Sequence, residues 1–212
     1  MLSAIMLALA SNLDNVGVGV AYGVRKTRVP LASNLLIAAI TATGTLASML
    51  CGHAIGKLLN QGLASLLAGG LLIGMGLWVM IREALSIYRR DGALQLFANS
   101  TPHLGTGYLA RVHTIRENPL SADGDLSGQI DPAEAILLGL ALTPNNLVNG
   151  AAAGVMDLSL ALTVILVFLI SLATISAGIA AGQQCGRRWL GNLAGVVSGA
   201  LLVFIGTCEI VV

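Results

Sequence analysis

Residues 7–24 read LALASNLDNVGVGVAYGV, an apolar run with one carboxylate, that of Asp14, near its middle. The run is long enough to cross the hydrocarbon core of a bilayer, which takes about 20 residues of helix. A charge at that depth is costly, so it is expected to face a protein interior or a water path and to mark a functional site. We therefore expect the rest of the chain to be organised around Asp14.

A second stretch of the sequence is similar to the first. Residues 138–155 read LGLALTPNNLVNGAAAGV, and a shift of 131 positions, from 7 to 138, aligns Asn15 with Asn146. The same shift places Asp14 on Asn145. Two related helices, each broken by polar residues at the same depth, are typical of the binding site of a secondary transporter.

The composition is that of a helical membrane protein. Of the 212 residues, 56% are hydrophobic and only 10% are charged, which is far from the balance in soluble domains. The net charge of +1 gives no reason to expect a nucleic-acid partner. The three cysteines show no zinc, copper or disulfide pattern. The sequence also lacks a nucleophile elbow, a P-loop and an HExxH element, so we expect no enzyme.

The hydrophobic runs predict an all-α, polytopic membrane protein with six transmembrane helices. The predicted spans are 2–24, 31–56, 64–88, 132–156, 157–182 and 190–212. Three spans per half force the two halves into opposite orientations, so we expect a 3+3 inverted-topology repeat with a site near the membrane midplane. The predicted units are a first repeat at 1–88, a long loop at 89–131 and a second repeat at 132–212.

Each predicted span carries a GxxxG pair. The pairs are Gly19/Gly23, Gly52/Gly56, Gly70/Gly74, Gly150/Gly154, Gly178/Gly182 and Gly195/Gly199. A shift of 126 positions aligns the second pair with the fifth. Small residues at this spacing let helix backbones approach closely. We expect these glycines to pack helices rather than to bind a ligand, and a homodimer through such faces is one assembly that they allow.

The basic residues predict the orientation of the chain in a lipid bilayer. Ten of the eleven Lys and Arg residues lie at or after the ends of the first, third and fifth spans, and only Lys57 follows the second. By the positive-inside rule, both termini are expected outside and the loop 89–131 in the cytoplasm.

Several residues offer oxygen atoms to an ion at the depth of Asp14. Carboxylate, amide and freed backbone carbonyl oxygens suit hard divalent cations such as Mn²⁺, Mg²⁺ or Ca²⁺, and Pro144 frees one carbonyl of its helix. A polar face of the second predicted span adds further oxygens. The candidate ligands of a transported cation are Asp14, Asn12, Asn15, Asn34, Thr45, Asn145, Asn146 and Asn149. The alternative is that the Asn, Ser and Thr side chains only join helices by hydrogen bonds.

The end of the long loop fits a different kind of cation site. Residues 123–134 read DGDLSGQIDPAE, which matches the twelve-residue EF-hand calcium loop, with Gly128 at the sharp turn in position six. The predicted ligands are Asp123, Asp125, Ser127, the backbone carbonyl of Gln129, Asp131 and Glu134. We expect this loop to bind Ca²⁺, or the transported ion, from the cytoplasm.

The same residues allow a second interpretation. Asp131 can cap the helix that begins at Pro132, with Glu134 in its first turn, and capping is compatible with cation binding. Upstream, Asn118 and Pro119 argue against a full entering helix, so we expect a loop followed by one helix. A cation bound there would fix the start of the fourth span and so bias a gate.

With these residues in view, the chain resembles the manganese efflux pump family, which is MntP-like and belongs to the LysE superfamily, and it is most similar to the YtaF-like sporulation branch. The segments that carry the resemblance are NLDNVGVGVAYGVR at 12–25, the DxDxSGxIDxxE loop and LLGLAL at 137–142. The resemblance implies a bacterial inner-membrane exporter of Mn²⁺ with an acidic residue in both the first and the fourth span.

The chain departs from that pattern at one position. Asp14 matches the first acidic residue, but Asn145 stands where the resemblance implies the second. One carboxylate compensates the charge of a dication less than two do. Glu83 and Glu209, near the ends of their spans, are candidates for a further acid.

These observations predict a secondary transporter that exports a divalent cation, and the expected ion is Mn²⁺. Because the sequence has no Walker motif, an ion gradient would drive transport. The alternative is a non-transporting, calcium-binding membrane sensor or a sporulation-associated structural membrane protein. A passive channel is a third interpretation.

Overall fold

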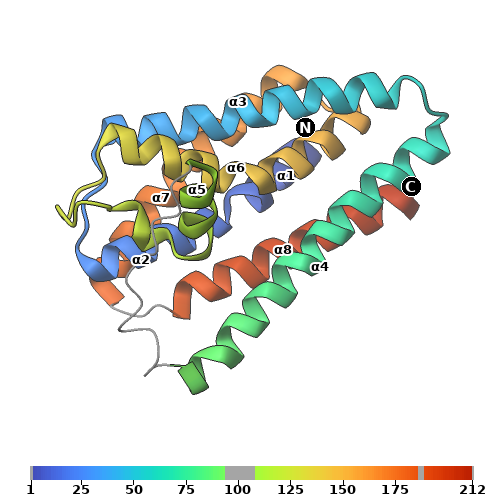
Figure 1. Ribbon diagram of the computed structural model, residues 1–212. Helices are drawn as coiled ribbons and strands as arrows, with labels where there is room; N and C mark the ends of the chain where they lie inside the picture. The colour runs from blue at the N-terminus through green and yellow to red at the C-terminus, as the bar shows by residue number, and fades with distance from the viewer. Residues whose placement is uncertain (1, 94–107, 186–188, 212) are drawn as a thin grey trace.

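The computed structural model describes residues 2–93, 108–185 and 189–211 (Figure 1). Within these residues the regular elements are helices, which confirms the predicted all-α class. They are α1 (Leu2–Asn12), α2 (Asp14–Arg25), α3 (Leu31–Gly56), α4 (Gln61–Ala93), α5 (Tyr108–Glu117), the 3₁₀ helix η1 (Pro119–Ala122), α6 (Pro132–Val155), α7 (Leu160–Cys185) and α8 (Trp189–Val211).

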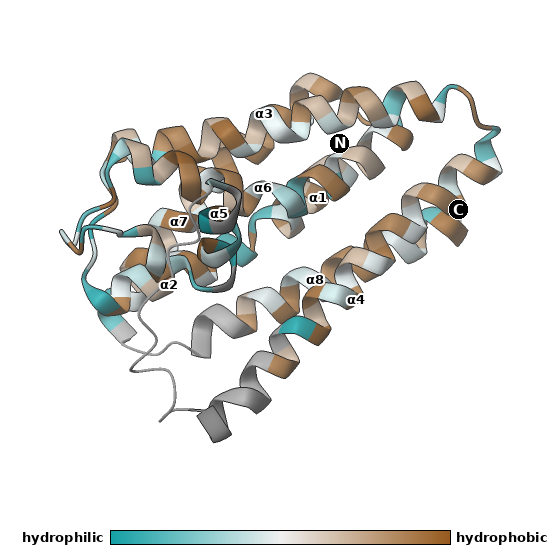
Figure 2. Cartoon of the chain, viewed as in Figure 1, coloured by the Kyte–Doolittle hydropathy of each residue, from teal (hydrophilic) through white to brown (hydrophobic). Residues whose placement is uncertain are grey.

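The apolar surface of these helices identifies a multi-pass membrane protein. Within the described ranges, five segments are long and apolar enough to cross a membrane, namely Ser3–Arg25, Leu31–Gly56, Gln61–Arg82, Leu160–Gln184 and Leu193–Val211. Figure 2 shows the hydrophobic residues that cover these helices. The predicted fourth span, 132–156, forms as helix α6 but is not among the five. Its three asparagines and Pro144 make it more polar than the others, and its asparagines are buried inside the bundle.

The first predicted span is interrupted at one residue. α1 ends at Asn12 and α2 begins at Asp14. The residue between them, Leu13, keeps a helical φ of −67° and ψ of −28°, so the two helices together form the single span Ser3–Arg25. The Asn12 side-chain amide donates a hydrogen bond to the carbonyl of Ala8, 2.9 Å away, and bonds of this kind compete with the helix ladder. The related helix α6 differs from the prediction, because it runs unbroken through Pro144.

Three helix pairs approach each other through glycine, namely α2 with α7, α3 with α6, and α4 with α8. A Cβ added to Gly19 of α2 would lie 2.5 Å from the carbonyl oxygen of Ile175, and one added to Gly178 of α7 would lie 2.5 Å from that of Val16. The pair α3 and α6 is equally close. There the glycines with such backbone contacts are Gly52, Gly56, Gly150 and Gly154. These glycines therefore pack helices within the chain, as predicted.

The GxxxG pair of α4 behaves differently. Nothing lies within 4 Å of a Cβ added to Gly70 or Gly74, and both glycines are exposed. Gly199 of α8, in contrast, packs against the carbonyl of Gly76. The homodimer stays a prediction. Gly70 and Gly74, on the exposed face of α4, are open to contact with a second chain.

One end of the bundle carries the connection between α4 and α6. We call residues 108–131 the connecting segment. It lies at the same end of the bundle as the end of α2 and the starts of α3 and α6, and we call this end the loop end (Figure 1). Both chain ends lie toward the opposite end. Ile115, Ala122 and Ile130 of the segment are buried in one apolar cluster with Tyr22 and Leu138. The connecting segment is therefore part of the hydrophobic core.

We expect Gly19→Ala to destabilise the protein by about 1–3 kcal/mol, because the added methyl group forces α2 and α7 apart. Gly70→Ala is the matched control, since it adds the same group to an open helix face, and it should leave stability equal or slightly higher. Thermal unfolding in detergent measures both. Equal melting temperatures for the two variants would contradict the close packing.

Candidate functional site

Asp14 lies where the two half-helices α1 and α2 meet. It occupies the first turn of α2, where the helix dipole stabilises a negative charge. The Asn145 amide of α6 donates a short hydrogen bond to Oδ2 of Asp14. Asn145 is 9% exposed and Asp14 is half-buried. The two positions that the repeat aligns are thus in direct contact.

Further polar side chains surround this pair. Asn149 donates to the hydroxyl of Ser11 at 2.9 Å, and Asn15 donates to Oδ1 of Asn12 at 3.1 Å. Ser198 of α8 donates to the carbonyl of Ala10 at 2.5 Å. Sequence reasoning missed two of these residues. Ser11 stands in the same polar run as Asp14 and could have been found, whereas no pattern pointed to Ser198.

Two buried amide oxygens remain available as ligands. Within the described residues, no hydrogen-bond donor lies at Oδ1 of Asn146 or of Asn149. Both side chains are 1% exposed. A buried oxygen without a donor is costly in an apolar interior, so these atoms suit a cation or an ordered water molecule.

Two predicted ligands are hydrogen-bonded elsewhere. Asn34 donates to the carbonyl of Leu172 at 3.2 Å and to the hydroxyl of Ser176 at 3.0 Å, both on α7. Thr45 donates to the carbonyl of Thr41 in its own helix at 2.9 Å. These bonds agree with the alternative interpretation for the polar face of α3, in which it joins helices.

The structure does not place a second acid beside Asp14 within the residues it describes. Glu209 lies near the end of α8 and accepts a hydrogen bond from Ser65, near the start of α4, so it belongs to the end of the bundle opposite the loop end. The side chain of Glu83 lies outside the described residues.

The loop 123–134 brings three carboxylates together. Asp123, Asp125 and Glu134 each have one carboxylate oxygen that lies within 4.8 Å of those of the other two. Gly128 takes a φ of +75°, and its N–H donates to Asp123 at 3.1 Å. Hydrogen bonds from the backbone and the hydroxyl of Ser127 hold the pKa of Asp125 below its usual range. The three side chains therefore already have the spacing of a hard-cation site.

The remaining loop positions divide between two roles. The Ser127 hydroxyl donates to the carbonyl oxygen of Gln129 at 2.9 Å, so two predicted ligand oxygens are neighbours. Asp131 and Glu134 form the capping box of α6, in which the Asp131 N–H donates to Glu134 at 3.1 Å. Asp131 lies outside the carboxylate group and serves as the helix cap of the alternative interpretation.

The loop is hydrogen-bonded to the connection between α2 and α3. Arg28 donates its N–H to the carbonyl of Gly128 at 2.8 Å, and Ile130 donates its N–H to the carbonyl of Arg28 at 2.9 Å. The hydroxyl of Ser33 reaches the carbonyl of Ile130 at 2.7 Å. In an EF-hand pair, a second loop occupies this place. Here the α2–α3 connection takes it, which the sequence did not indicate.

The segment before the loop is also attached to α2. Tyr22, fully buried, donates its hydroxyl to the carbonyl of Pro119 at 2.6 Å. The helix α5 ends at Glu117, so the predicted stop before Asn118 and Pro119 is confirmed. The loop therefore lacks a continuous entering helix, although the short α5 precedes it.

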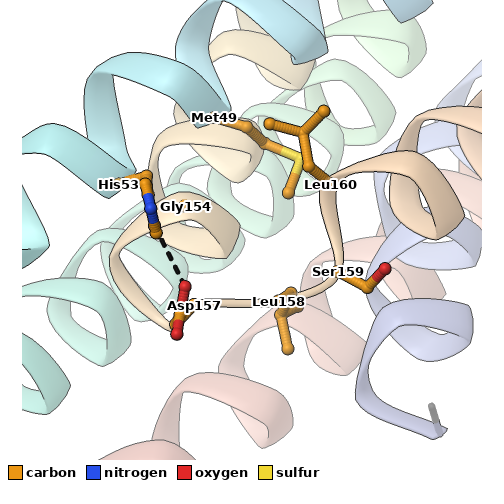
Figure 3. A pocket seen from close by; sticks show the side chains of 7 residues that line it. All are labelled: Met49, His53, Gly154, Asp157, Leu158, Ser159 and Leu160. Atoms are coloured by element: carbon orange, nitrogen blue, oxygen red, sulfur yellow. Dashed lines mark ion pairs between the residues drawn. The ribbon is translucent and has the colours of Figure 1, made fainter.

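The opposite end of the bundle holds an ion pair. Figure 3 shows Nδ1 of His53, on α3, pointing to Oδ1 of Asp157 at 3.0 Å, beside a cavity of about 230 Å³. The two side chains are 40% and 82% exposed, and exposed pairs contribute little to stability. His53 is thus a paired residue near the end of α3.

Comparison with known proteins identifies the family. The chain is 33% identical over 207 residues to the probable sporulation protein YtaF of Bacillus subtilis (strain 168), a match that covers 97% of each chain. The chain belongs to the YtaF family. This confirms the sporulation branch of the resemblance and leaves manganese export as a proposal. No protein-family model and no solved structure matches the chain.

We expect Tyr22→Phe to loosen the connecting segment, because it removes the hydrogen bond to Pro119, which stabilises the fold by about 1 kcal/mol. Amide hydrogen exchange of residues 108–130 should become faster. Tyr108→Phe is the control, since that ring is 81% exposed. Unchanged exchange in Tyr22→Phe would show that the segment does not depend on this bond.

Proposed function

We propose that the chain is a secondary transporter that exports a divalent cation across the bacterial inner membrane, and that this cation is Mn²⁺. The contact between Asp14, at a helix break, and Asn145 carries this proposal. An ionisable residue inside a membrane bundle marks an ion or proton path. Discontinuous helices with ligands at the break are a recurring feature of transporters.

The proposed architecture is a 3+3 inverted repeat with α6 as the fourth of six spans. A helix of 24 residues is about 36 Å long, enough to cross a bilayer core. The glycine contacts support the repeat. The shifts of 131 and 126 positions turn Gly19 into Gly150 and Gly178 into Gly52. Gly19 and Gly178 meet between α2 and α7, and Gly150 and Gly52 each pack against the partner helix in the related pair α6 and α3.

The proposed orientation follows from charge. The loop end carries the connecting segment and most of the basic residues, so we place it in the cytoplasm and both chain ends outside. The transported ion would then meet the loop 123–134 before it reaches Asp14.

The chemistry of the site favours a hard dication. Asp14 supplies a carboxylate oxygen, and Asn146 and Asn149 have amide oxygens that accept no hydrogen bond within the described residues. Such ligands suit Mn²⁺ or Mg²⁺ more than soft ions. The site carries one carboxylate, in contact with Asn145, instead of two acids, so its negative charge is smaller. We therefore do not propose the exchange of two protons for one ion.

The loop 123–134 is proposed as a second, cytoplasmic site for Ca²⁺ or the transported ion. Asp123, Asp125 and Glu134 would bind the ion, together with Ser127 and the carbonyl of Gln129. Because Glu134 lies in the first turn of α6, a bound ion would fix the start of the helix that carries Asn145.

A second candidate function has its own support. The relative from Bacillus subtilis is named a probable sporulation protein, and the loop is hydrogen-bonded to the α2–α3 connection. These observations also fit a non-transporting, calcium-binding membrane sensor or a structural membrane protein of sporulation. The polar group around Asp14 favours the transporter, because a sensor needs no ligands inside the membrane.

We expect Asp14→Asn to abolish Mn²⁺ flux in proteoliposomes while the protein stays folded, because the site loses its negative charge. Mn²⁺, Ca²⁺, Mg²⁺, Cd²⁺ and Zn²⁺ are compared on the same preparation. Asp157→Asn is the matched control, since it neutralises an exposed carboxylate at the end of the bundle. Saturable flux that survives in Asp14→Asn would refute the site. No flux of any ion in the wild type would favour the sensor.

We expect the double substitution Asp123→Ala and Asp125→Ala to eliminate cation binding at the loop in isothermal titration with Ca²⁺ and Mn²⁺. Asp157→Asn again serves as the control. Asp131→Asn keeps the helix cap and tests the division of roles, because Asp131 lies outside the carboxylate group. Retained binding in Asp131→Asn would support the arrangement described here, and retained binding in the double variant would exclude the loop as the site.

A further inference from the structure

Two apolar clusters flank the contact between Asp14 and Asn145. The chain-end cluster includes Leu7, Ala10, Met49 and Ala153, and the loop-end cluster includes Tyr22, Leu138, Ala141 and Ile175. Ala10 stands one helix turn before Asp14, and Ala141 stands one turn before Asn145. Because α1 runs toward the site from the chain ends and α6 runs toward it from the loop end (Figure 1), the two alanines lie on opposite sides. The polar site is therefore enclosed between the two clusters.

The internal repeat relates the two clusters to each other. A shift of 131 positions turns Leu7 into Leu138, and the residue moves from the chain-end cluster to the loop-end cluster. Each of the four residues named for one cluster has its counterpart in the other at a shift of 131 or 126. The pairs are Leu7/Leu138, Ala10/Ala141, Met49/Ile175 and Tyr22/Ala153. An inverted repeat exchanges the two sides of the membrane, so one repeating unit accounts for both clusters.

Both clusters are closed in this structure. Each of the eight residues is at most 2% exposed. A charged group that leaves water for an apolar environment loses its hydration, which is very costly. Hydrophobic constrictions close ion paths in membrane proteins for this reason. An ion that crosses either cluster therefore needs the side chains of that cluster to separate.

The two clusters differ in how they are covered. In the loop-end cluster, Tyr22 takes the place that Ala153 has in the other, and its hydroxyl donates to the carbonyl of Pro119 at 2.6 Å. The connecting segment adds the buried side chain of Ile115 to the same cluster. The chain-end cluster has no such cover among the described residues, and Met49 lines the cavity of about 230 Å³ (Figure 3). The loop-end cluster is therefore the more firmly closed of the two.

We propose that the two clusters are the gates of the ion path, and that the connecting segment is the lid of the loop-end gate. The proposal rests on the proposed transport function and assigns the residues that control access to its site. The loop-end gate would admit the ion from the cytoplasm while the chain-end gate stays closed, and the chain-end gate would then release it. Both gates are closed in the conformation described here, so the site is occluded.

The test measures access to the site from each side of the membrane. In a variant whose native cysteines are replaced by serine, Ser11→Cys places a thiol beside Asn149. A small cationic methanethiosulfonate is applied to vesicles from one side at a time. A parallel variant with the single cysteine substitution Leu126→Cys, at a position that is 83% exposed in the loop, shows which side the loop end faces.

We expect Leu138→Ala to raise the labelling rate at least about fivefold from the loop-end side alone, because it removes side-chain volume from that gate only. Leu7→Ala, its counterpart in the repeat, should raise the rate from the chain-end side alone. Leu140→Ala and Leu9→Ala are the matched controls. They are also related by the shift of 131 positions, and they lie on the exposed faces of the same two helices.

Truncation of a buried leucine can prevent folding, so Leu138→Val and Leu7→Val are measured beside the alanine variants. Size-exclusion chromatography in detergent shows which variants fold. The valine variants should change the rates in the same direction but by less. Tyr22→Phe tests the lid, and it should raise the rate from the loop-end side alone, because the bond to Pro119 is lost.

The same variants are assayed for Mn²⁺ flux, so the two proposals can fail separately. Wild-type flux, with labelling that Leu7→Ala and Leu138→Ala raise no more than Leu9→Ala and Leu140→Ala do, would overturn the gates and leave the transporter intact. Faster labelling from both sides in each variant would also overturn the gates, because general loosening would explain it. If the wild type carries no ion, the transport function fails, while side-specific increases would still show that the clusters control access to Asp14.

Discussion

A carboxylate inside a membrane bundle has to be compensated by the protein, and the surroundings of Asp14 follow from that need. The helix is interrupted at Leu13, so Asp14 stands in the first turn of α2, where the helix dipole stabilises its charge. Asn145 supplies a hydrogen bond from the repeat-related helix. The polar helix α6 is thereby kept in the interior, where its asparagines are buried.

The glycines make this arrangement possible. Helices that carry polar side chains inward must lie close together if those side chains are to meet. At Gly19 and Gly178 the backbones of α2 and α7 approach so closely that one methyl group would collide with a carbonyl. α3 and α6 meet in the same way. The four helices α2, α7, α3 and α6 form one contacting group, and α4 and α8 pack beside it (Figure 1).

The connecting segment is where the membrane bundle and the loop meet. It is buried through Ile115 and Ile130, and it is hydrogen-bonded to α2 at Tyr22 and to the α2–α3 connection at Arg28. The connecting segment therefore contacts the helix that carries Asp14, through Tyr22, and its loop leads into the helix that carries Asn145.

The sequence by itself determined the helical class, the glycine packing, the helix stop before Asn118 and Pro119 and the pairing of Asp14 with Asn145, because apolar runs, helix-breaking residues and an internal repeat are local or periodic signals. Only the tertiary structure decided that α6 runs unbroken while the first span is interrupted, that Asn34 bonds to α7 and that the α2–α3 connection lies beside the loop. These features depend on contacts between residues far apart in the chain, and one sequence carries no periodicity that reveals which distant side chains or backbone groups will meet.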